Sequence, residues 1–117
     1  MNPLYKNLYS YMTFRRWWAN KLTKRPTNLY DYQTGKMMSL EKRFTRELPK
    51  IQDLCDFVNS LDAGVMITFS TDRKYYITIT DKFNDASLEG TDLIETFINA
   101  ILLFLDMKEK NEKERGV

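Results

Sequence analysis

The residues best suited to binding a ligand lie between positions 14 and 25 of this 117-residue chain, where one Phe and two Trp alternate with five Lys or Arg. Guanidinium and ammonium groups neutralise phosphates, and flat rings stack on unpaired bases at about 1–3 kcal/mol per base. This mixture predicts contact with a polyanionic partner. The predicted contact residues are Arg15, Arg16, Trp17, Trp18, Lys21, Lys24 and Arg25.

Two structural interpretations compete with this prediction. In the first, Trp17 or Trp18 anchors a helix on the core and the basic side chains are merely solvated. In the second, the basic half docks onto the acidic half of its own chain. The charge distribution permits both, because residues 1–50 hold eleven Lys or Arg against three acids, and residues 51–117 hold seven against thirteen.

A second cluster consists of four acids within twelve residues, Asp81, Asp85, Glu89 and Asp92. They suggest a loose cation site, a negative patch facing a basic partner, or a solvated loop in which some acids cap a helix. The spacing does not match a calcium loop, because Phe83 occupies a position that should carry an oxygen ligand.

The composition argues against most enzymes. The chain has no His, which removes the usual general base and the commonest zinc ligand. Its four glycines are far apart, so no phosphate-binding loop is predicted. The single cysteine, Cys55, is expected to be a small buried hydrophobe and not a nucleophile. We therefore expect no catalysis, no cofactor, no metal and no small-molecule substrate.

Cysteine usage and hydropathy predict a cytoplasmic protein. A single cysteine forms no intrachain disulfide, which fits a reducing compartment. The N-terminus lacks a charged stretch followed by an apolar run, so no secretory signal is predicted. The longest apolar run, residues 100–105, is far shorter than the roughly 20 residues of a membrane span.

Residues 64–105 are predicted to form the centre of the fold. The segments 65–69 and 75–79 alternate apolar and polar residues, which indicates two antiparallel strands with one buried face. A polar loop, 70–74, joins them, and 81–90 is read as a polar connection. Residues 91–105 have apolar residues at helical spacing, with Asp92 and Glu95 in a capping arrangement.

This last predicted helix is apolar on more than one side, so it needs a helical partner as well as a sheet. That partner is either the helix ending at Leu61 or a second copy of the chain. The exposed edges of a two-stranded sheet also invite pairing with another molecule, so a homodimer is a candidate assembly.

Three regions are predicted along the chain. Residues 1–38 form a basic aromatic arm with one helix over about 1–25, interrupted on its apolar side by Arg15, and a connector that is extended near 29–32. Residues 39–107 form an α-β-β-α core, in which Pro49 marks either a boundary between two helices or a kink in one. Residues 108–117 form a charged, frayed tail. The predicted class is α+β, with N-terminal helices, an antiparallel hairpin and a long C-terminal helix packed on the sheet.

Residues 49–106 resemble small α/β sandwich-like accessory proteins of bacteriophages and prophages. The resemblance rests on a Lys-Tyr-Tyr-Ile-Thr-Ile strand at 74–79 and a helix with the pattern Leu-Ile-Glu-x-Phe-Ile-x-Ala at 93–100. It implies a protein of a mobile element, acting in the host cell, of a kind that often inhibits host nucleases or defence complexes, anti-CRISPR proteins included.

These observations lead to one functional hypothesis and two rivals. The hypothesis is a non-enzymatic binding protein whose basic aromatic arm engages nucleic acid or a host nucleoprotein. The first rival is a structural or oligomerising protein that uses the Trp-rich helix as core or dimer interface. The second is an enzyme with Asp81, Asp85 and Glu89 as magnesium ligands.

Overall fold

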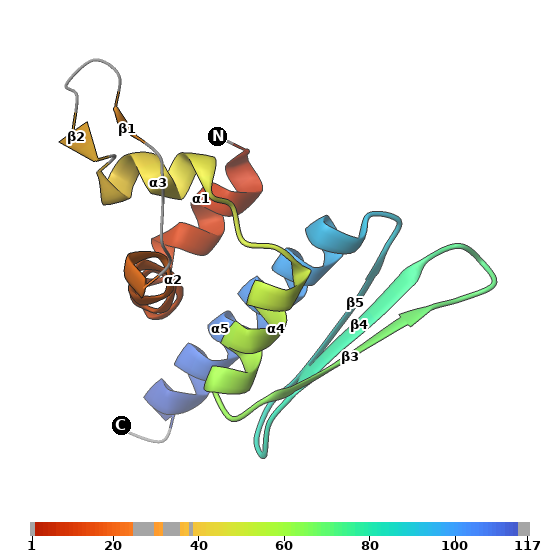
Figure 1. Ribbon diagram of the computed structural model, residues 1–117. Helices are drawn as coiled ribbons and strands as arrows, with labels where there is room; N and C mark the ends of the chain where they lie inside the picture. Colours follow the sequence, from red (N-terminus) through yellow and green to blue (C-terminus); the bar gives the residue numbers. More distant parts are fainter. Residues whose placement is uncertain (1, 25–29, 32–35, 38, 115–117) are drawn as a thin grey trace. The chain divides into compact units, whose positions relative to one another are not determined.

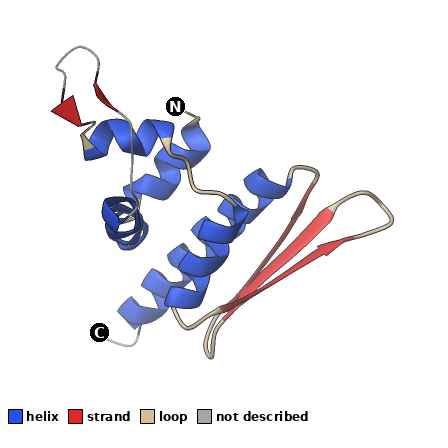
Figure 2. Ribbon diagram, viewed as in Figure 1, coloured by secondary structure: helices blue, strands red, loops and turns tan. Residues whose placement is uncertain are grey.

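The chain divides into two compact units, Met1–Pro49 and Lys50–Val117. Figure 1 labels their helices and strands, and Figure 2 separates helix from strand by colour. The α+β class predicted from the sequence is confirmed. The computed structural model describes residues 2–24, 30–31, 36–37 and 39–114.

The N-terminal unit begins with two helices, α1 (Pro3–Ser10) and α2 (Met12–Lys24), so the single predicted helix is wrong. The chain turns at Tyr11, whose backbone is extended at φ −81° and ψ 115°. At about 100° per residue, the buried side chains of the two segments would face directions roughly 130° apart on one straight helix. The break lets both sets pack together. These side chains are Tyr5, Leu8 and Tyr9 in α1 and Phe14, Trp18 and Leu22 in α2.

The third helix, α3 (Leu40–Arg46), belongs to the N-terminal unit. The Tyr9 hydroxyl donates a hydrogen bond to the Phe44 carbonyl at 2.9 Å, and the two rings lie 5.3 Å apart. The predicted boundary after residue 38 is therefore placed too early. It fails because aromatic contacts distant in sequence attach α3 to the first two helices.

Pro49 separates α3 from α4 (Ile51–Ser60), so the helical pattern over 39–61 is two helices and not one kinked helix. The Asp53 carboxylate accepts a hydrogen bond from the Lys50 backbone N–H at 2.9 Å, which caps α4.

The predicted connector falls largely outside the described residues. Two short strands are described within it, β1 (Tyr30–Asp31) and β2 (Lys36–Met37), and they pair antiparallel with Tyr30 opposite Met37. The predicted extended piece near 29–32 is confirmed for β1, while residues 29 and 32 lie outside the described part.

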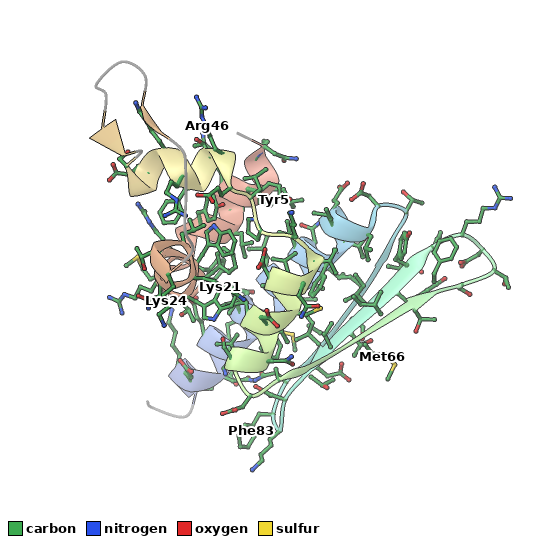
Figure 3. The ribbon with its side chains drawn as sticks, viewed as in Figure 1. Tyr5, Lys21, Lys24, Arg46, Met66 and Phe83 are labelled. Atoms are coloured by element: carbon green, nitrogen blue, oxygen red, sulfur yellow. The ribbon has the colours of Figure 1, made fainter. Side chains whose placement is uncertain are left out.

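The C-terminal unit contains a three-stranded antiparallel sheet in the order β3-β4-β5. β3 (Gly64–Phe69) and β4 (Tyr75–Thr80) are the two predicted strands, joined by the predicted loop. Figure 1 shows α4 and α5 on one side of the sheet. On the other side, Met66 projects away from the helices (Figure 3). The register places Val65, Ile67 and Phe69 opposite Ile79, Ile77 and Tyr75. The buried face predicted for both strands is confirmed only for β4, because β3 lies at the edge of the sheet and none of its residues is buried.

The third strand, β5 (Asp85–Gly90), was predicted to be a polar connection, and that prediction is wrong. Ala86 and Leu88 lie opposite Ile79 and Ile77 of β4, so the segment does alternate between faces. Asp, Ser, Glu and Gly are poor strand formers. Packing against α5 and pairing with β4 override that weak preference.

The last helix, α5 (Leu93–Glu114), packs on β4 and β5, and α4 lies against both β3 and α5. The same chain thus supplies a helical partner for α5, as one of the two alternatives predicted. The Asp92 carboxylate accepts a hydrogen bond from the Glu95 N–H at 2.8 Å, which confirms the predicted cap. Within the described residues, no helix is both long and apolar enough to cross a bilayer.

α5 continues to Glu114, so the predicted frayed tail from residue 108 is wrong up to that point. Its last turns have contacts that the sequence pattern did not reveal. Lys108 lies 3.8 Å from the Asp81 carboxylate, and the Asn111 amide donates a hydrogen bond to Asn84. These polar contacts hold the end of the helix against the loop between β4 and β5.

Candidate polyanion-binding surface

A buried aromatic cluster positions the basic residues of the N-terminal unit. The ring of Phe14 lies 5.9 Å from that of Tyr9 and 6.5 Å from that of Trp18, and all three side chains are buried. Burial raises the pKa of the Tyr9 hydroxyl to about 12, so it remains a hydrogen-bond donor to Phe44. This packing fixes which side of α2 faces solvent.

The solvent side of α2 carries Arg15, Arg16 and Lys24, and α3 adds Arg46. We call these four exposed residues the basic surface, although Figure 3 shows Arg46 extending from α3 on the side away from Lys24. Arg15 and Arg16 line a hollow of about 200 Å³ between α2 and α3 together with Phe44 and Glu41. The guanidinium carbon of Arg15 lies 5.6 Å from the centre of the Phe44 ring. Two guanidinium groups at one hollow can bind an oxyanion by paired N–H donors, as lysine cannot.

Helix dipoles account for some of these cations but not for all of them. Lys24 and Arg46 lie in the last turns of α2 and α3, where positive charge stabilises a helix. Arg15 lies in the first turn of α2, which contains no acid. Positive charge at that end opposes the dipole, so helix stability does not explain Arg15.

The structure separates the predicted contact residues into three groups. Arg15, Arg16 and Lys24 are exposed, as the binding hypothesis requires. Trp18 is 0% exposed and stacks within the core, so its predicted role in stacking on a base is wrong in this fold. Arg25 lies outside the described residues.

Trp17 and Lys21 form an intermediate group. Both are half-buried, and the Lys21 ammonium lies 4.7 Å from the centre of the Trp17 ring. The Trp17 and Trp18 rings are 6.1 Å apart. A cation therefore already faces the Trp17 ring, which leaves little of that ring for a base.

Sequence reasoning missed Arg46, although it was included in the charge count of the first fifty residues. Figure 3 shows its side chain extending from α3. The neighbouring Arg43 is different, because it is buried and forms an ion pair with Glu47 one turn later. The signal that distinguishes them is the amphipathic period of α3, in which Arg43 adjoins the buried Phe44.

The acidic cluster does not form a cation site. Asp81 accepts hydrogen bonds from the backbone N–H groups of Phe83 and Asn84 at 2.8 and 2.7 Å, and Asp92 caps α5. The Glu89 carboxylate lies on β5, 3.8 Å from Lys74. Among the described residues, no three His, Cys, Asp or Glu side chains gather as a metal site. The predicted capping is confirmed for Asp92, but Asp85 and Glu89 lie on β5 and not in the predicted loop. The proposed magnesium ligands are not brought together as a set of three.

Two other features of the C-terminal unit were considered as sites. Burial raises the pKa of the Cys55 thiol, and the neighbouring Asp56 raises it further, so the reactive thiolate is disfavoured. A hollow of about 460 Å³ is lined in part by Asp81, Asn84 and Lys108, but these polar groups already bond to one another or to neighbouring backbone.

Comparisons with protein-family models, curated proteins and solved structures found no match for this chain. Its function is therefore inferred from its own charge and geometry.

Proposed function

We propose that the N-terminal unit binds a polyanion through the basic surface of Arg15, Arg16, Lys24 and Arg46. The observation that carries the proposal is the pair of exposed arginines, Arg15 and Arg16, at one hollow. Arg15, in the first turn of α2, also opposes the helix dipole. The unit as a whole holds ten Lys or Arg against three acids.

Recognition is by charge more than by stacking, because Trp18 is in the core and Lys21 faces Trp17. The partner is a nucleic acid or the nucleic-acid-bearing surface of a host complex. A non-enzymatic inhibitor of a host nuclease or defence complex, carried by a phage and acting in the host cytoplasm, fits this chemistry. Binding releases the counterions condensed on the polyanion, so the affinity depends steeply on the salt concentration.

The test is fluorescence anisotropy with labelled single-stranded DNA, duplex DNA and RNA. If about four phosphates are contacted, the plot of log affinity against log salt has a slope near −3 to −4. The double variant Arg15→Glu/Arg16→Glu should lose at least about tenfold in affinity at 50 mM salt, because two contacts become repulsive. Glu41→Gln should bind more tightly, because it removes a carboxylate from the same hollow.

The matched control is Arg73→Glu/Lys82→Glu, which makes the same change in charge at two exposed residues of the C-terminal unit. It should change affinity by less than about threefold. Equal losses in both double variants would show that only net charge matters, and no binding to any of the three probes at low salt would exclude nucleic acid as the partner.

A second candidate function is the structural or oligomerising one. The complete burial of Trp18 favours it, since that ring acts as core. Binding to heparin, a polyanion without nucleobases, distinguishes the two candidate functions. Retention that depends on Arg15 and Arg16 supports the basic surface, and no retention supports the structural role.

A further inference from the structure

The outer edge of β3 is a surface that polyanion binding does not use. Among the described strands, only β4 pairs with β3, and five of its six residues are exposed. The exposed apolar side chains are Met66 at 69%, Ile67 at 36% and Phe69 at 59%. A strand edge of this kind offers unpaired backbone groups to another strand.

The hydrogen bonding of the β3–β4 pair shows which groups are offered. The Ser70 N–H donates to the Lys74 carbonyl at 3.0 Å, in the same register as the strand pair. Bonded positions alternate along antiparallel strands, so the even-numbered residues of β3 bond to β4. Val65, Ile67 and Phe69 therefore direct their N–H and C=O groups away from the sheet.

The opposite edge of the same sheet is protected, and β3 is not. β5 carries the charged Asp85 and Glu89, whereas a helix packs on each of the two edge strands, α5 on β5 and α4 on β3. β3 contains no charge and no proline, and its six pairs with β4 are consecutive, without a bulge. Charge, proline and bulges are the usual devices that prevent edges from pairing.

We propose that β3 pairs with β3 of a second copy of this chain, antiparallel, about a two-fold axis at Ile67. In this register Ile67 faces its own counterpart, and Val65 faces Phe69 of the second copy. The backbone N–H and C=O groups of all three residues that point away from the sheet are then paired, forming about six hydrogen bonds between the two copies. The cross-strand neighbours are β-branched and aromatic side chains, which stabilise antiparallel pairs.

The helix layer explains why the occupant is a second copy and not an isolated peptide strand. Burial of the helix-facing side chains falls along β3, from the half-buried Val65 to Phe69, which is 59% exposed. α4 ends close to the start of β3 in sequence and lies against that strand. Two-fold pairing places the start of one β3 beside the end of the other, so α4 of each copy comes over the exposed Phe69 of its partner.

The register also fixes what lies beyond the strand ends. It places Asp62, just before one β3, opposite Asp72 in the turn 70–74 of the second copy, and the neighbouring Arg73 and Lys74 make that turn net positive. A single strand pair is a small interface, and small interfaces are mostly transient, so we expect a reversible dimer. Assembly is followed between about 10 and 100 µM, a range in which a dimer of micromolar affinity forms.

Sedimentation across that concentration range tests the pairing with two matched variants. Phe69→Lys puts a charge on the edge and should weaken dimerisation at least about tenfold. Phe83→Lys makes the same substitution at a residue of similar exposure, 65%, in the loop between β4 and β5, and should leave it unchanged. A wild-type chain that stays monomeric throughout overturns the proposal, as do equal effects of the two variants.

Disulfide trapping tests the register independently. In a Cys55→Ala background, Ile67→Cys places two thiols at the axis, where paired Cα atoms lie about 5.5 Å apart, within disulfide range. Oxidation should yield a covalent dimer, and Thr68→Cys should yield much less. Circular dichroism of each variant verifies that the fold is retained. Preferential cross-linking through Thr68→Cys, or no cross-linking of either folded variant, overturns pairing about Ile67.

Discussion

The two units of this chain use charged side chains in opposite ways. In the C-terminal unit, Asp53, Asp81 and Asp92 accept hydrogen bonds from backbone N–H groups, so these acids stabilise helix starts and a turn. In the N-terminal unit, aromatic packing supplies the core, and Arg15 and Arg16 lie on its surface. The comparison indicates that these three acids serve the fold, whereas Arg15 and Arg16 remain accessible to a partner.

The largest expected effect comes from removing the centre of the aromatic core. Trp18→Ala should destabilise the N-terminal unit by about 3–5 kcal/mol, because a large buried ring leaves a cavity. A unit of this size has little stability to lose. Hydrogen exchange read by mass spectrometry should show lost protection in α1 and α2 and retained protection in β3, β4 and β5.

Met12→Ala, at a residue 56% exposed on the same helix, is the control and should leave protection unchanged. Loss of protection throughout both units after Trp18→Ala would contradict the view that each has its own core.

A smaller effect is expected from the acid that organises the β4–β5 loop. Asp81→Ala removes the acceptor for Phe83 and Asn84 and leaves the buried Asn84 amide without that partner. We expect a loss of about 2–3 kcal/mol in the free energy of unfolding, measured by urea denaturation.

The pH dependence of the same site has a definite sign. Burial of the Asp81 carboxyl raises its pKa, but hydrogen bonds from Phe83 and Asn84 and the charge of Lys108 lower it more, to below its ordinary value of 3.8. A lowered folded-state pKa adds stability above the unfolded-state pKa, and that stability disappears as the pH falls through the folded-state value. Below about pH 4 the free energy of unfolding should therefore fall less in Asp81→Asn than in the parent chain. The same pH dependence in both chains would contradict this.

The smallest expected effect tests the packing between β5 and α5. A Cβ at Gly90 would lie 2.2 Å from the Thr96 hydroxyl oxygen and 3.3 Å from its Cβ. Thr96 is buried, and its hydroxyl donates to the Asp92 carbonyl at 2.6 Å, so it has little room to move. Gly90→Ala should lower the free energy of unfolding by about 1–3 kcal/mol.

Gly64→Ala is the matched control for that substitution. A Cβ at Gly64 has no atom within 4 Å, and alanine is better than glycine within a strand. Its stability should equal or slightly exceed that of the parent chain. Equal destabilisation by both substitutions would show that contact with Thr96 is not the cause.

The elements predicted best were those with a strong local period. β3 and β4 are rich in β-branched and aromatic residues, and the Asp92 cap precedes a regular helical pattern. The positions of these elements therefore followed from local sequence. β5 was missed because its residues are weak strand formers and its pairing with β4 is what orders them. The end of α5 was missed because Lys108 and Asn111 contact a loop more than twenty residues earlier.

By itself, the sequence determined the α+β class, the hairpin and the separation of basic from acidic residues. Hydrophobic period depends only on residues near one another in the chain, and the distribution of charge is read directly from the sequence. Only the tertiary structure decided which aromatic rings are core and which cations remain on the surface. Trp17 and Trp18 are adjacent and chemically identical, yet one is half-buried beneath Lys21 and the other is fully enclosed. The physical reason is that burial depends on the break at Tyr11 and on contacts between α1, α2 and α3, which no local pattern specifies.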